Sequence, residues 1–126
     1  MFIRKISEIV GTERDVEFEH KGFKSQRLLL EKDGMGFSFH KTILPKGLKQ
    51  IWHYKKHLEA CYCIEGEAFV TNLETGEKFH ILPETIYVLN NHEKHKFEAI
   101  KDTILISVFN PPVKGNEQHN NEGSYE

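Results

Sequence analysis

Apolar and polar residues alternate along most of this chain in short runs, and turn residues separate the runs. An alternation with a period of two is typical of β-strands, because successive side chains of a strand point to opposite faces. Turn sequences such as DGMG at 33–36 and ETGE at 74–77 end these runs every eight to twelve residues, a spacing typical of a sandwich or barrel. Strands are expected at 25–30, 37–44, 51–64, 68–72, 78–82, 85–89, 96–100 and 104–109, with an edge strand within 1–12.

The stretch 53–66, HYKKHLEACYCIEG, is the most informative part of this pattern. Its residues His53, His57 and Glu59 are evenly spaced, so in one strand they would share a face with Cys61 and Cys63. Histidine and cysteine are unusual on a face that only contacts water, although a solvated surface strand is the alternative. The pattern therefore predicts a strand that lines a cavity containing a site. The opposite face would carry Trp52, Tyr54, Leu58, Ala60, Tyr62 and Ile64.

Length and charge limit the possible classes of protein. The 126 residues are enough for one domain with its own core, and 17 basic against 19 acidic residues leave no basic field for a nucleic acid. No apolar run resembles a signal peptide or approaches the ~20 residues of a membrane span. Cys61 and Cys63 are too close on one strand to bridge easily, so we expect free thiols and a soluble cytoplasmic protein. We expect an all-β, single-domain barrel of the jelly-roll type over 1–113 with little helix, and a polar tail or lid at 114–126.

Spacing within the central stretch resembles the first sequence motif of the cupins. Gly47 precedes His53 by six positions, His57 and Glu59 follow, and Gly66 comes after six further residues. The paired His-x-His of that motif is absent because position 55 is Lys, and the second cupin motif, around 76–83, is weaker. The resemblance implies a cupin-type β-barrel.

Four longer stretches, at 25–39, 53–67, 85–95 and 108–123, resemble the ectoine synthases, a family of small cupins. The resemblance implies a carbon-oxygen hydro-lyase that cyclises N-γ-acetyl-L-2,4-diaminobutyrate to L-ectoine with loss of water. It also implies a Fe²⁺ or other divalent metal cofactor and a homodimer. An apolar N-terminal edge segment is suited to pairing with a second chain. Neither a nucleic acid nor a membrane is expected as a partner.

Residue roles follow from the same resemblance. It implies that Glu59, Tyr87 and His95 bind the metal and act in catalysis, with Glu117 or a histidine as the base. Two departures from the family pattern, Phe23 in place of tryptophan and Glu84 in place of glycine, bear on substrate affinity rather than on the metal. The substrate contacts implied by the resemblance are Phe23, Arg27, His40, Thr42, His53, Phe109 and His119.

Other interpretations stay open at this point. Tyr87 is also compatible with a core tyrosine, His95 with a solvated loop residue, and His57 with either a ligand or an orienting group. A cupin module that binds or senses a small metabolite without turnover is one alternative function. A cupin dioxygenase or isomerase is another, and it would favour clustered histidines with a carboxylate, here His53, His57 and Glu59.

Overall fold

The structure is a computed structural model that describes residues 1–125; Glu126, the last residue of the predicted tail, lies outside the described residues. Helix is limited to two single turns, and no helix of residues 1–125 is long and apolar enough to cross a membrane. The elements in chain order are α1 (Ile6–Ile9), β1 (Asp15–Glu17), β2 (Lys24–Leu29), the 3₁₀ turn η1 (Glu31–Asp33), β3 (Ser38–Leu44), β4 (Lys49–Trp52), β5 (Leu58–Glu65), β6 (Ala68–Asn72), β7 (Lys78–Ile81), β8 (Ile86–Leu89), β9 (His95–Ala99) and β10 (Thr103–Asn110).

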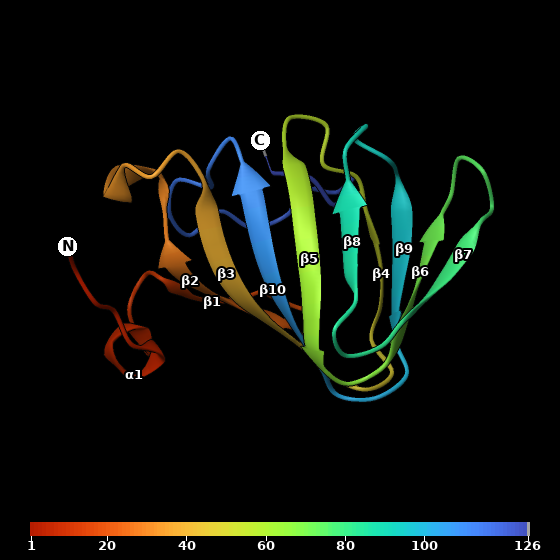
Figure 1. The fold of residues 1–126 in the computed structure, drawn as a ribbon, viewed down its shortest axis with the longest axis horizontal. Helices are drawn as coiled ribbons and strands as arrows, with labels where there is room; N and C mark the ends of the chain where they lie inside the picture. The colour runs from red at the N-terminus through yellow and green to blue at the C-terminus, as the bar shows by residue number, and fades with distance from the viewer. Residues whose placement is uncertain (126) are drawn as a thin grey trace.

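The strands form two antiparallel sheets, which lie side by side in Figure 1. The larger sheet has the order β1-β2-β3-β10-β5-β8, and the smaller has the order β4-β9-β6-β7. Within residues 1–125, no pairing of strands joins the two sheets. The barrel is therefore open rather than fully closed. This architecture confirms the predicted all-β fold with little helix.

Two local predictions are wrong. The expected edge strand within 1–12 contains the helical turn α1, where the carboxylate of Glu8 accepts a hydrogen bond from the Lys5 N–H at 2.9 Å. The expected single strand 51–64 is two strands, because the chain leaves β4 after Trp52 and begins β5 only at Leu58. The break matters for the site, since side chains on its two sides no longer follow one alternation.

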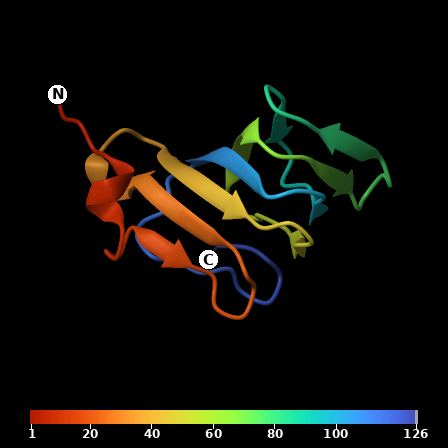
Figure 2. The same ribbon diagram turned by 90° about the horizontal axis from the view of Figure 1, so that it is seen from below.

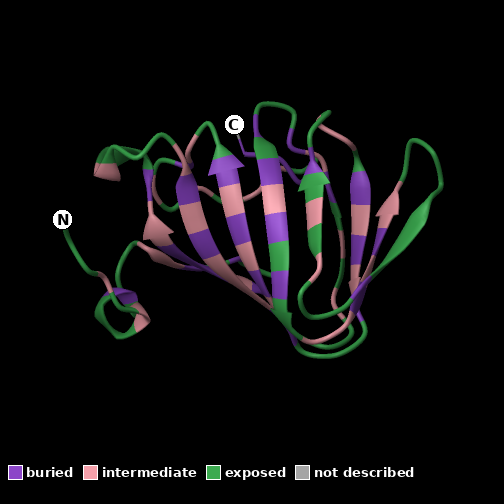
Figure 3. Cartoon of the chain, viewed as in Figure 1, coloured by how far each residue is buried: buried purple, intermediate pink, exposed green. Residues whose placement is uncertain are grey.

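Burial alternates along the long strands, as the purple and paler bands of β5 and β10 show in Figure 3. On β5 the buried residues are Glu59, Cys61 and Cys63, while Tyr62 and Ile64 are exposed on the outer face. The prediction that this strand lines a cavity is confirmed. Its apolar face, however, points to solvent rather than to the core.

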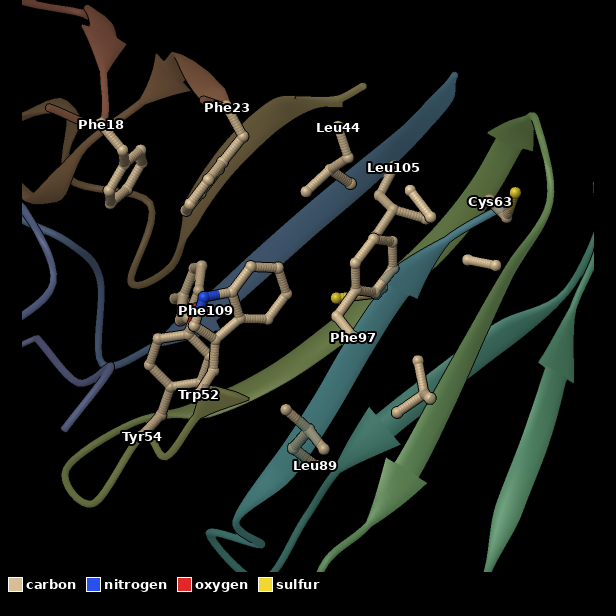
Figure 4. Close-up of a cluster of buried hydrophobic side chains, with 14 of the residues drawn as sticks. Phe18, Phe23, Leu44, Trp52, Tyr54, Cys63, Leu89, Phe97, Leu105 and Phe109 are labelled. Atoms are coloured by element: carbon tan, nitrogen blue, oxygen red, sulfur yellow. The ribbon is translucent and has the colours of Figure 1, made fainter. Parts of the chain in front are cut away.

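Aromatic side chains fill the space between the two sheets (Figure 4). The Trp52 ring from β4 stacks on Phe97 from β9 with centroids 5.3 Å apart. Phe23, just before β2, packs on the Trp52 ring with centroids 5.5 Å apart. Such ring pairs bury large apolar areas and fix the relative position of the sheets. Phe23 and Trp52 also border a small space that polar groups of β5, β8 and β10 line from the larger sheet.

The C-terminal segment 114–125 returns across the molecule, and Figure 2 shows it looping beside β1 and β2. The Gln118 side chain donates to the carbonyl oxygen of Glu17 at 2.8 Å, and the His53 N–H donates to the Gly123 carbonyl at 3.1 Å. Gly123 has φ of 72°, and a Cβ there would overlap the Ile51 carbonyl, so only glycine allows this close approach. The close approach carries Tyr125 into the interior, where it is buried.

Candidate active site

A small cavity lies between the sheets, with a volume of about 20 Å³, which is room for about one water molecule. Every strand of the larger sheet except β1 contributes to its wall, together with β4 and the C-terminal segment. The lining residues are Phe18, Phe23, Ser25, His40, Thr42, Trp52, Tyr54, Glu59, Cys61, Tyr87, Leu105, Ser107, Phe109, His119 and Tyr125.

Several buried side-chain atoms have no hydrogen-bond partner among residues 1–125, and they include Oε1 of Glu59, the hydroxyl of Tyr87 and Nε2 of His95. Nε1 of Trp52 and Nδ1 of His119, two residues that line the cavity, are unpaired as well. Leaving such an atom unpaired costs roughly 1–3 kcal/mol, so each of them is a candidate to contact a ligand. Glu59, Tyr87 and His95 are the three residues that the sequence resemblance gives as metal ligands.

The Glu59 carboxyl is held in an unfavourable environment for its charge. It is 5% exposed, and burial raises its pKa to about 8, although hydrogen bonding with Cys61 and Ser107 acts in the opposite direction. A nearby cation would favour the carboxylate and remove this penalty. The position therefore suits a carboxylate that binds a positive ion.

The His95 ring is oriented by its own backbone neighbourhood. Its Nδ1 lies 2.9 Å from the Glu93 carbonyl oxygen, which can only accept, so Nδ1 carries the ring hydrogen and Nε2 carries the free lone pair. Burial lowers the pKa of His95, which keeps the ring neutral, and a neutral imidazole whose other nitrogen is fixed by a carbonyl is typical of metal sites.

Tyr87 borders one hollow with Glu59 and another with His95. It lines the cavity with Glu59, and it also lines a neighbouring groove of about 300 Å³ with His95, between β8 and strands β6, β7 and β9. Within residues 1–125 no three His, Cys, Asp or Glu side chains are grouped for a metal, so a site here needs the Tyr87 oxygen as a ligand. A carboxylate, a phenol oxygen and an imidazole suit a divalent iron-type ion, and the residues present fit such a group.

Arg27 is fully buried in β2 and is bound to the C-terminal segment. Its Nη1 donates to the Gly115 carbonyl and its Nη2 to the Glu117 carbonyl, both at 2.8 Å. Its Nη2 also donates to the Tyr125 hydroxyl at 3.1 Å. In this closed arrangement the guanidinium has few donors left for a substrate carboxylate.

His119 and Glu117, both from the tail, are placed very differently. His119 lines the cavity, its Nε2 is 2.8 Å from the Tyr54 hydroxyl, and its buried Nδ1 has no partner in the described chain. Burial lowers the pKa of His119 to about 3, so the ring is neutral at neutral pH. The Glu117 carboxylate instead accepts from the N–H groups of Lys114 and Gly115, outside the cavity.

The remaining predicted contacts divide in the same way. Phe23, Thr42 and Phe109 line the cavity, and the Thr42 hydroxyl is 3.0 Å from that of Ser107. His53 lies in a separate surface hollow with Lys55 and Lys94, so the expectation that it shares a face with Glu59 is wrong. The reason is the break between β4 and β5.

The whole chain, residues 1–126, matches the family model described as ectoine synthase. It is 48% identical to the L-ectoine synthase of Desulfosudis oleivorans, over 100% of this chain and 97% of that protein. Among solved structures, the ectoine synthase from P. lautus superimposes with a TM-score of 0.84 at 42% identity, over 90% of this chain and 80% of the other.

The chain belongs to the ectoine synthase family. A cupin of the RmlC type from Shewanella frigidimarina superimposes with a TM-score of 0.63 at 23% identity, over 75% of this chain and 81% of that one. That likeness concerns the fold alone and confirms the predicted cupin-type architecture.

Some cavity residues of this ectoine synthase family member were missed from the sequence. Ser25 and Ser107 each lie two positions from a residue that was considered, Arg27 or Phe109, and so share its face of the strand. That alternation was the available signal. No such signal existed for Tyr54 or Tyr125, because neither lies in a strand and the path of the connecting chain sets its direction.

Proposed function

We propose that this chain is an ectoine synthase, a hydro-lyase that cyclises N-γ-acetyl-L-2,4-diaminobutyrate to L-ectoine. The α-amine nitrogen would form a bond to the acetamide carbon, and the acetamide oxygen would leave as water. The match to the family model over all 126 residues carries this proposal. A second observation supports it: each of the family's ligand positions carries a buried atom with no hydrogen-bond partner among residues 1–125.

A divalent metal, Fe²⁺ or a similar ion, would be held by Glu59, Tyr87 and His95. When bound, such an ion supplies a Lewis acid that polarises an amide oxygen, which matters because an amide is a poor electrophile. The chain itself supports these ligands through the Glu93 carbonyl, which fixes His95, and through Cys61 and Ser107, which hydrogen bond with Glu59.

His119 is the residue best placed to take the proton from the substrate amine. It lines the cavity, and its Nδ1 has no protein partner in residues 1–125. Burial in the closed cavity lowers its pKa to about 3, so the ring is a weak base until the surroundings become more polar. Glu117, the other candidate base, has its carboxylate bound to backbone N–H groups of the tail. We therefore favour His119 for proton transfer and assign Glu117 to the position of the tail.

The segment 114–125 would act as a lid. With its side chains in place the cavity holds about one water molecule, which is too small for the substrate. Tyr125 occupies much of the interior, with its ring 5.5 Å from that of Tyr54 and 5.4 Å from that of Phe109. Opening would release donors of Arg27 for the substrate carboxylate, and closure would exclude water from the dehydration.

A homodimer in the cytoplasm is part of the same proposal. The outer faces of β5 and β8 form an apolar surface, where Tyr62 pairs with Ile86 and where both residues are exposed. β8 is also an edge strand of the larger sheet in the described chain, with its outer side unpaired. Phe2 and Ile3 of the N-terminal segment are exposed, and a second copy could bury both apolar regions.

The decisive experiment uses the purified full-length chain with Fe²⁺ and N-γ-acetyl-L-2,4-diaminobutyrate, with chromatography to quantify L-ectoine. We expect ectoine to form in proportion to enzyme, and we expect the Tyr87→Phe variant to lose turnover while its thermal unfolding stays cooperative. Binding of the substrate to folded, iron-loaded protein without any ectoine would instead support a binding module. Uptake of oxygen with a different product would support the dioxygenase alternative.

A further inference from the structure

His40 lies between two serine hydroxyls in the wall of the cavity. Its Nδ1 is 2.9 Å from Oγ of Ser25, and its Nε2 is 2.9 Å from Oγ of Ser38. The ring is 1% exposed and packs against Phe109 with centroids 5.1 Å apart. Both ring nitrogens are thus occupied within the protein, so His40 has no free nitrogen for a substrate.

Ser38 decides which nitrogen of His40 carries the hydrogen. Its Oγ accepts a hydrogen bond from the Val113 N–H at 2.9 Å, and Ser38 is 0% exposed. Among residues 1–125 the only other partner of this hydroxyl is His40, so its hydrogen must go to Nε2 or remain buried without an acceptor. A buried hydroxyl without an acceptor is costly, so Ser38 donates to Nε2.

The hydrogen of a neutral His40 ring must then sit on Nδ1, which donates to Ser25. Burial first, and then the positive charge of Arg27, lowers the pKa of His40 well below its usual value, in agreement with a neutral ring. The Ser25 oxygen also accepts from Nε of Arg27 at 3.2 Å. With two bonds accepted, its lone pairs are used, and its own hydrogen has no acceptor among the described residues.

Ser25 faces the cavity, whereas Ser38 does not line it. We propose that the Ser25 hydroxyl donates a hydrogen bond to the substrate carboxylate, and that His40 and Ser38 are positioning residues that aim it. A carboxylate is the expected acceptor because Ser25 lies beside the buried guanidinium of Arg27, which attracts an anion. The assignment of the substrate carboxylate as the acceptor rests on the proposed function. The directions of the hydrogen bonds among Ser25, His40 and Ser38 are independent of it.

The directions of the hydrogen bonds around His40 can be measured without any catalytic turnover. In protein labelled with ¹⁵N-histidine, two-bond ¹H–¹⁵N correlation spectra distinguish a ring protonated at Nδ1 from one protonated at Nε2. We expect His40 to be the Nδ1–H form at neutral pH, and the Ser38→Ala variant, which removes the donor to Nε2, to shift the ring toward the Nε2–H form. An Nε2–H ring in the unaltered protein would overturn the proposal.

Kinetics test the contact itself. Ser25→Ala should raise KM for the acetylated diaminobutyrate roughly 10- to 100-fold, with a smaller change in kcat, as for loss of a hydrogen bond to a charged group. Ser38→Ala should raise KM less, and the double variant should be no worse than Ser25→Ala, because both changes affect one hydroxyl. Ser7→Ala, an exposed serine in α1, is the matched control and should leave both constants unchanged.

Folding and function are separated by two further readouts. Each variant is first checked by thermal unfolding, and calorimetry then measures substrate binding to the same protein. Weaker substrate binding in Ser25→Ala supports the contact between Ser25 and the substrate, whether or not the protein forms ectoine. A protein that forms no ectoine would count against the proposed function and not against this contact. Unchanged binding and unchanged KM in a folded Ser25→Ala protein would overturn the contact.

Discussion

Nη2 of Arg27 donates a hydrogen bond to the Tyr125 hydroxyl at 3.1 Å, across a separation of 98 residues in the chain. The same guanidinium carbon lies 5.3 Å from the centre of the Tyr125 ring. The residue predicted to bind the substrate carboxylate is therefore bound by the chain's own C-terminal segment. We therefore expect the tail to compete with the substrate for Arg27.

Tyr125→Phe removes this hydrogen bond while keeping the ring in the core. Because one donor of Arg27 is released, we expect KM for the substrate to fall by about 3- to 10-fold, the effect of a hydrogen bond worth about 1 kcal/mol. Steady-state kinetics with the full-length variant would measure it. A rise in KM would instead mean that the Tyr125 hydroxyl contacts the substrate.

Gly123→Ala should displace the tail without altering any cavity side chain. An alanine Cβ would overlap the Ile51 carbonyl, and a φ of 72° is unfavourable for alanine. Since Trp52, the single tryptophan, lies beneath this contact, we expect its fluorescence to shift to longer wavelength as water reaches it. Gly115→Ala is the matched control, because a Cβ there makes only an ordinary contact; an equal shift in both variants would argue against a specific closure.

Metal binding should depend on Glu59, Tyr87 and His95, the residues proposed to hold the ion. Glu59→Ala or His95→Ala should reduce bound divalent metal from about one per chain to nearly none, because each removes a ligand from a three-residue set. Elemental analysis after dialysis against Fe²⁺ under anaerobic conditions would measure occupancy. His80→Ala, which changes an exposed histidine paired with Glu67, is the control and should keep full metal occupancy. Full occupancy in Glu59→Ala and His95→Ala as well would refute the assignment of the ligands.

The metal-free protein should become less stable as the pH rises from about 7 to about 8. Burial raises the pKa of Glu59 from 4.5 to about 8, so the folded state holds a proton there that the unfolded state has already lost, and stability falls with pH. The slope from one such group is at most about 1.4 kcal/mol per pH unit. In this range the buried histidines, whose pKa values are lowered, are neutral in the folded state and largely neutral in the unfolded state.

Denaturant unfolding at several pH values, with a chelator present, would measure the slope. Glu59→Gln cannot titrate at this position and should flatten the dependence between pH 7 and 8. A slope that is unchanged in Glu59→Gln would assign the effect to another group.

Assembly should depend on the outer face of β5 and β8. Ile86→Glu places a charge where 58% of the isoleucine is exposed in the single chain, so we expect a dimer to dissociate into monomers. Light scattering at micromolar concentration would measure the mass. Leu73→Glu changes an exposed leucine after β6, away from this face, and should leave the mass unchanged; a dimer that survives both changes would place the interface elsewhere.

The sequence alone determined the fold class and much of the cavity wall, because strand alternation is a local property that follows from backbone geometry. From the residues at 58–65 it followed that Glu59 and Cys61 share a face, and family spacing singled out Tyr87 and His95. The alternation pattern fails where the chain leaves the strand. It predicted His53 beside Glu59, but His53 lies in another hollow.

Only the tertiary structure decided which groups meet across strands and across the chain. The Tyr125 ring reaches Arg27 because the tail passes close to Ile51 at Gly123. The Ser25 hydroxyl is directed by His40 because strands β2 and β3 pair Arg27 with His40. Such contacts depend on strand register and on the path of a loop, and neither is encoded in the spacing of nearby residues. Burial, which raises the pKa of Glu59 and leaves its oxygen unpaired, is likewise a property of the assembled sheets.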